Sequence, residues 1–114
     1  MAHSIGYARS LCEVAKEKFF TRHDVDYFYP ADKTSEVIAE ELSKQTGIPV
    51  VHDYTKATIN TVVVKGFIDR DLSLEFPKVK VFGLIVKKGV KHDFAVITGC
   101  NQDVRWEWES KEAE

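Results

Sequence analysis

The sequence has few residues of the kinds that mark special chemistry or special architecture. Its 114 residues include only two cysteines, three prolines and six glycines. Cys12 and Cys100 stand near opposite ends of the chain with no CxxC spacing, which favours free thiols over a disulfide. No apolar run is long enough to cross a bilayer, and residues 1–6 lack the features of a secretory signal. These absences predict a cytoplasmic protein with no membrane partner.

Catalytic motifs are lacking as well. The chain has no Gly-x-Ser-x-Gly elbow, no glycine-rich phosphate loop and no paired-cysteine motif. An aspartate directly follows three of the four histidines, in His23-Asp24, His52-Asp53 and His92-Asp93. All three pairs fall at expected turns or strand ends, where aspartate is a common turn former; a metal or acid–base site is the alternative. We therefore expect no catalytic residue, no bound metal and no cofactor.

Charge of either sign is not in excess, since the net charge is −2 with 30% charged residues. Such a chain has no strong overall field that would draw it to nucleic acid or to an anionic membrane. The length suits one domain with a single core. We expect a single α+β domain over residues 1–114, with a frayed tail at 110–114.

Two helices are expected in the first half of the chain. Apolar residues at helical spacing predict a helix from Ser4 to about Phe20. A second helix has Asp32 or Thr34 as its N-cap, and it ends at Gly47 because Pro49 forbids its continuation. Residues 24–29 alternate in polarity and predict a short edge strand before Pro30, and residues 48–51 could add another.

The second half reads as successive strands rich in β-branched and aromatic residues. The runs are 61–68, 79–86, 94–98 and 104–108. Residues 52–68 fit either a strand or a long helix, and their β-branched density favours the strand. Short turn signals separate the runs, so we expect one or two N-terminal helices packed on a predominantly antiparallel sheet of four or more strands, built as a C-terminal β-meander.

The distribution of charge suggests one candidate surface. Residues 78–91 contain five lysines and no acid, whereas residues 103–114 have a net charge of −3. A basic hairpin that carries Phe82 could contact phosphates and stack bases. The alternative is that these lysines keep a sheet edge from aggregating.

Trp106 and Trp108 share one face of the last expected strand with Val104. They belong to the core if that strand is central, and to an interface if it is an edge. Tryptophan often dominates binding energy. The candidate binding residues are Trp106, Trp108, Phe82, Lys80, Lys87, Lys88, Lys91 and Arg105.

These features predict a small non-enzymatic binding or regulatory protein that acts through protein contacts, such as an inhibitor or accessory factor of a virus or mobile element. A protein partner is expected, and a homodimer is possible. The alternatives are a nucleic-acid-binding module centred on residues 78–91 and, with less support, a metal-dependent hydrolase.

Overall fold

The computed structural model describes residues 2–21 and 24–109. His23 and the expected frayed tail at 110–114 lie outside the described residues. Three short helical turns accompany the regular elements, at Lys16–Phe20, Tyr54–Lys56 and Glu107–Glu109. The regular elements are β1 (Ala2–His3), α1 (Ile5–Ala15), β2 (Tyr27–Pro30), α2 (Lys33–Thr46), β3 (Thr61–Ile68), β4 (Lys80–Lys87), β5 (Phe94–Cys100) and β6 (Arg105–Trp106).

Helix α1 begins where the sequence predicts. The Ser4 side chain caps it by accepting a hydrogen bond from the Tyr7 backbone N–H at 3.2 Å. Its inward face includes Cys12, and burial raises the pKa of that thiol to about 12, with a further contribution from the charge of Glu41. A π-helical turn continues the helix and places Phe20 in the core.

Helix α2 also has the ends that the sequence predicts. The Asp32 carboxylate accepts a hydrogen bond from the Ser35 N–H at 2.8 Å. At the other end, Gly47 adopts a left-handed conformation with φ of 80°, and its N–H donates to the Ser43 carbonyl. Glycine adopts this conformation without the steric cost that a Cβ would bring.

The direction of the strands corrects the expected fold. The main sheet has the order β2-β3-β4-β5, and every pair in it is parallel, so the prediction of an antiparallel meander is wrong. Residues 69–79 and 88–93 are not hairpin turns, because they return the chain across the sheet to begin the next parallel strand. Most residues of β3 and β4 are buried on both faces, as is usual in parallel sheets.

The strand order reverses at β2. Val50 pairs in parallel with Phe28 on the outer side of β2, and the Phe28 N–H donates to the Pro49 carbonyl at 2.9 Å. The chain thus passes outward from β2 through α2 and then returns to β3 on the opposite side of β2. The long helix that residues 52–68 could have formed is absent, because the chain makes one short turn and then enters β3 at Thr61.

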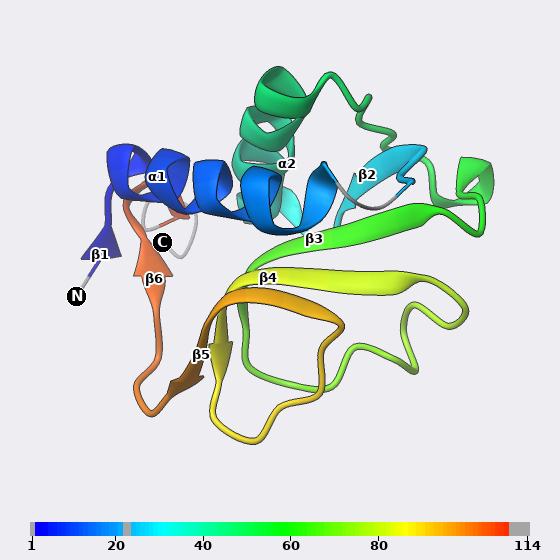
Figure 1. Cartoon of the computed structure of the whole chain (residues 1–114). Helices are drawn as coiled ribbons and strands as arrows, with labels where there is room; N and C mark the ends of the chain where they lie inside the picture. Colours follow the sequence, from blue (N-terminus) through cyan, green and yellow to red (C-terminus); the bar gives the residue numbers. More distant parts are fainter. Residues whose placement is uncertain (1, 22–23, 110–114) are drawn as a thin grey trace.

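Helices α1 and α2 pack on the same face of the sheet (Figure 1). The core on this side includes Phe28, Leu42 and Phe82, all fully buried. The connecting segments cover the other face, where Leu72 and Phe76 pack against Val63 of β3 and Val81 of β4. The helices therefore cover one face, as expected, although the sheet beneath them is of a different class.

The last expected strand is shorter than its sequence pattern. Only Arg105–Trp106 is extended, and it pairs in parallel with Ala2–His3, after which residues 107–109 form a 3₁₀ turn. This pairing joins the two ends of the described chain beside α2. No helix in the described part of the chain is long and apolar enough to span a membrane.

Candidate functional site at the carboxyl edge of the sheet

The strand order identifies one place on the molecule as a candidate site. In open parallel sheets, ligands bind outside the carboxyl ends of the strands, at the point where the strand order reverses. Here that point lies between the ends of β2 and β3, and it contains a cavity of about 120 Å³. We call it the switch-point pocket. Its lining residues are Asp32, Thr34, Ser35, Lys65, Gly66, Phe67, Asp69, Val104 and Trp106.

An ion pair lies at the wall of this pocket. The ammonium group of Lys65, a residue of β3, contacts the Asp32 carboxylate at 2.5 Å, and the Lys65 side chain is only 16% exposed. Burial tends to raise the pKa of Asp32, but hydrogen bonds from Lys65 and Ser35 outweigh it and lower that pKa. Asp32 is therefore a carboxylate at neutral pH, and Lys65 is a cation that an anionic ligand could share.

Close packing between α2 and β3 forms the floor of the pocket. The Gly66 N–H donates a hydrogen bond to the Oγ of buried Ser35 at 3.1 Å. A Cβ at Gly66 would lie 2.4 Å from Nε1 of Trp106 and 2.7 Å from Cδ1 of Ile38. Only glycine fits there without displacing a large side chain, so this position fixes the approach of Trp106 to the sheet.

Trp106 lines the pocket and stacks on Trp108. Their ring centroids are 5.3 Å apart with an interplanar angle of 21°, and Nε1 of Trp108 donates to the Thr34 carbonyl at 2.8 Å. Trp106 is 2% exposed and belongs to the core, whereas Trp108 is half-buried. Trp106 is thus a core residue and Trp108 packs against the core, while an interface role for Trp108 stays a prediction.

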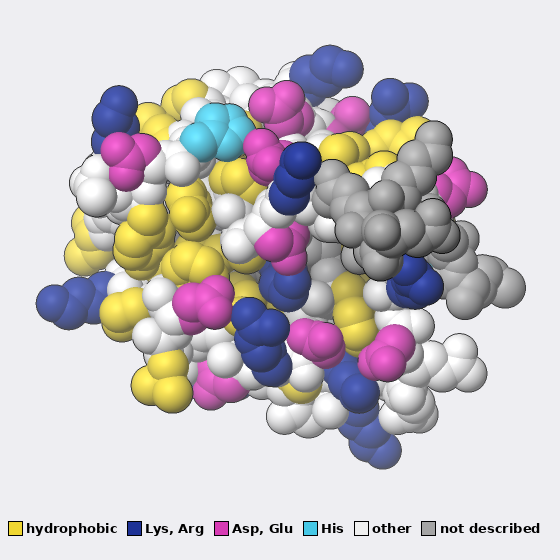
Figure 2. Space-filling view, turned by 180° about the vertical axis from the view of Figure 1, so that it is seen from behind, with side chains coloured by type: hydrophobic (Ala, Val, Ile, Leu, Met, Phe, Trp, Pro, Cys, Tyr) yellow, Lys and Arg dark blue, Asp and Glu magenta, His cyan; other side chains and the backbone are white. Residues whose placement is uncertain are grey.

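The structure does not gather the candidate lysines into one basic surface. Lys80 is exposed at the amino end of β4, whereas Lys87 and Lys88 lie at its carboxyl end. Lys91 is exposed in the return segment, and Lys87 pairs with Asp103 at 3.3 Å. Basic and acidic side chains are interspersed on the face seen in Figure 2. Residues 78–91 do not form a basic hairpin, since β4 and β5 are parallel.

The remaining candidates also lie apart from one another. Phe82 is fully buried against Phe19 and Phe20, with ring centroids 6.4 and 5.3 Å away, and it cannot stack on a ligand. Arg105 is exposed on β6. Of the predicted set, only Trp106 lines the switch-point pocket, and Trp108 contacts a lining residue, Thr34.

The two described His-Asp pairs support local structure. Asp53 accepts a hydrogen bond from the Thr55 N–H at 3.0 Å, and Asp93 accepts one from the Val81 N–H at 2.8 Å. His52 lies 3.6 Å from Glu36, and His92 contacts the Val90 carbonyl at 3.0 Å. Across residues 2–21 and 24–109, no group of three His, Cys, Asp or Glu side chains could hold a metal ion.

Sequence reasoning missed most of the pocket. It assigned Asp32 and Thr34 to helix capping, and it gave Lys65 and Gly66 no role. One signal was available, because a lysine followed by glycine interrupts an otherwise apolar strand. Glycine inside a strand often marks a close approach of another group, and here that group is Trp106.

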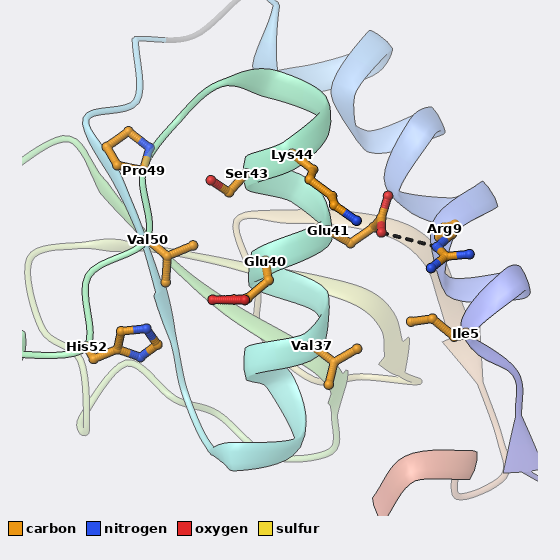
Figure 3. A pocket seen from close by; sticks show the side chains of 10 residues that line it. All are labelled: Ile5, Arg9, Val37, Glu40, Glu41, Ser43, Lys44, Pro49, Val50 and His52. Carbon is orange, nitrogen blue, oxygen red and sulfur yellow. Dashed lines mark hydrogen bonds and ion pairs between the residues drawn. The ribbon is translucent and has the colours of Figure 1, made fainter.

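A larger hollow lies between α1, α2 and residues 49–52. Its volume is about 720 Å³, and side chains of both helices and the 49–52 segment line it (Figure 3). We call it the α1–α2 groove. Arg9 pairs with Glu41 across it at 3.2 Å. Its lining residues are Ile5, Arg9, Val37, Glu40, Glu41, Ser43, Lys44, Pro49, Val50 and His52.

Comparison with known proteins identifies the fold. No family model matches the chain, and no curated protein matches it. A hypothetical protein from Neisseria gonorrhoeae, solved with bound ppGpp, superposes with a TM-score of 0.75 at 13% identity, covering 96% of this chain and 89% of that one.

Two purine phosphoribosyltransferases share the fold. The xanthine-guanine-hypoxanthine phosphoribosyltransferase of Helicobacter pylori has a TM-score of 0.61 at 13% identity, covering 99% of this chain and 97% of that one. The purine phosphoribosyltransferase of Pyrococcus horikoshii has a TM-score of 0.63 at 19% identity, covering 93% and 89%. The chain therefore has a phosphoribosyltransferase-like fold.

These findings correct the functional expectation. The prediction of a non-enzymatic regulatory protein or inhibitor on an antiparallel sheet is wrong, because the neighbours with this parallel fold are two purine phosphoribosyltransferases and a hypothetical protein solved with bound ppGpp. The fold is thus of an enzyme type. The nucleic-acid alternative loses the basic hairpin on which it depended.

Proposed function

We propose that the switch-point pocket binds a phosphate group of a purine nucleotide, which is a substrate or product of a phosphoribosyltransferase-type reaction in the cytoplasm. The observation that carries this proposal is the position of the pocket, at the carboxyl ends of β2 and β3 where the strand order reverses. Similar folds bind ppGpp or act on purines in other organisms. A protein partner and a homodimer stay predictions.

The size of the pocket suits a phosphate better than a whole nucleotide. A volume of about 120 Å³ is well below the roughly 300–1,000 Å³ of sites that enclose entire small molecules. The sugar and base would therefore lie outside the pocket. Trp108 is half-buried beside it and offers an aromatic ring there.

The charges of the pocket suit an anion that competes with Asp32. The first turn of α2 has a partial positive charge, and Lys65 supplies a full one. Because Asp32 holds the Lys65 ammonium group, a phosphate must share or displace that contact. This arrangement predicts opposite effects for the two partners of one ion pair.

The test is a titration of the protein with GMP and with ppGpp, in which isothermal titration calorimetry measures the binding affinity. We expect Lys65→Ala to weaken binding about tenfold or more, as for the loss of a charged hydrogen bond. Asp32→Asn keeps an oxygen for the Ser35 N–H but frees Lys65, so it should strengthen binding. Lys44→Ala, in the α1–α2 groove, is the matched control and should change nothing.

A transfer assay completes the test. Purified protein receives guanine or hypoxanthine with a phosphoribosyl pyrophosphate donor, and the nucleotide product is measured. Product that disappears in Lys65→Ala supports the proposed reaction. Nucleotide binding without product would contradict the reaction but not the site. No binding in the wild type, or equal loss in Lys44→Ala, would overturn the site itself.

A further inference from the structure

A chain of packed rings connects β1 to the switch-point pocket. The His3 ring lies 4.7 Å from the Tyr7 ring and 5.7 Å from the Trp106 ring, measured between centroids. Trp106 stacks on Trp108, whose indole N–H donates to the Thr34 carbonyl in the pocket lining. We call Tyr7, His3, Trp106 and Trp108 the ring cluster.

The backbone fixes the centre of this ring cluster. His3 and Trp106 are partners in the parallel β1–β6 pair, so their rings are neighbours because of the strand register. On its other side, Trp106 lies against Gly66 with no room for a Cβ between them. Trp106 is thus held between β3 and His3, and it determines where Trp108 lies.

We propose that His3 is a positioning residue for the switch-point pocket, acting through Trp106 to hold Trp108 against the first turn of α2. This inference rests on the proposed nucleotide site. It makes nucleotide binding dependent on a residue of β1 that does not line the pocket. The His3 ring contacts Trp106 at an interplanar angle of 56°, and loss of this contact should let the Trp106 ring move relative to Trp108, so that the pair loses its fixed stacking.

The chain allows a readout that needs no ligand. It contains only two tryptophans, so an indole–indole exciton couplet in far-ultraviolet circular dichroism can arise only from the Trp106–Trp108 pair. Trp108→Phe should abolish the couplet and thereby assign it. A role of His3 in general stability would change the unfolding midpoint without changing this signal below the transition.

The variants separate ring packing from other effects of histidine. We expect His3→Ala to reduce the couplet and to weaken GMP binding about three- to tenfold, as the loss of one aromatic contact implies. His3→Phe keeps a ring at this position and should restore both. His52→Ala is the matched histidine control, because His52 lies on the rim of the α1–α2 groove, and it should change neither.

Each result decides the proposal. An unchanged couplet in His3→Ala overturns it, and so does a reduced couplet with unchanged GMP affinity. If the wild type binds neither GMP nor ppGpp, the proposed function fails. In that case a couplet lost in His3→Ala and restored in His3→Phe still supports the positioning of the tryptophan pair.

Discussion

The switch-point pocket and the α1–α2 groove differ in size and in the way they are built. The groove is about six times larger, with about 720 Å³ against about 120 Å³. Helix surfaces form most of its walls, and its ion pair has an Arg9 side chain that is 56% exposed. The pocket lies where strand ends, a helix N-terminus and a buried tryptophan converge. Volume alone would therefore favour the groove, whereas the strand order favours the pocket.

Burial explains why the smaller region is the better candidate. Lys65 is held by an acid and largely removed from water, so its contacts are stronger than those of exposed ion pairs. In the groove, Glu41 is bonded to Gln45 as well as to Arg9, and these bonds together lower its pKa although burial opposes them. Arg9 and Glu41 of the groove are thus already paired with each other.

The largest expected contrast between the two regions is in stability. Trp106→Ala should lower the free energy of unfolding by about 3–5 kcal/mol, because the side chain is 2% exposed and fills the space between β3 and β1. Val37→Ala, on the groove wall, is only half-buried and should cost less than about 1 kcal/mol. Chemical denaturation measures both. Equal losses would mean that the groove is as tightly packed as the pocket.

The glycines of the two regions give a second contrast. Gly66→Ala should cost about 1–3 kcal/mol and shift the tryptophan fluorescence, since its Cβ would clash with Trp106 and Ile38. Gly47→Ala, at the end of α2, meets no atom within 4 Å and should cost about 1 kcal/mol through its backbone conformation alone, with unchanged fluorescence. A Gly66→Ala variant with unchanged stability and unchanged fluorescence would contradict the close approach of Trp106.

Acid should lower the free energy of unfolding by protonating Asp32 in the pocket. The folded-state pKa of this carboxyl is lower than its unfolded value. Its contribution to the free energy of unfolding is therefore fully present above about pH 4 and is lost as the pH falls through the folded pKa. In Asp32→Asn this contribution is absent, and the acid limb of the stability curve should be flatter. Urea midpoints measured from pH 6 down to pH 2 test this. Parallel curves for the two proteins would contradict it.

The smallest expected effect belongs to the groove. Arg9→Ala removes an ion pair that solvent screens. The free energy of unfolding should therefore fall by about 0.2–1 kcal/mol, and by less in high salt. Thermal denaturation at low and high salt measures it. A loss above about 2 kcal/mol, or one that salt does not reduce, would show that the groove pair is as important as the pocket pair.

Local sequence features predicted the elements well because their causes are local. Asp32 caps α2 and Gly47 ends it, as the sequence indicates, since both depend on groups within one helical turn. The strand at Thr61–Ile68 follows from its β-branched residues. The direction of the strands was predicted wrongly, because side-chain alternation is the same in parallel and antiparallel strands.

The sequence by itself determined where the helices and most strands lie, and that the chain lacks the common catalytic motifs. Only the tertiary structure decided that the strands are parallel, that their order reverses at β2, and that Lys65 meets Asp32 while His3 meets Trp106. The physical reason is the separation along the chain. Lys65 and Asp32 are brought together by a crossover through α2, and no local propensity encodes which strands that crossover joins.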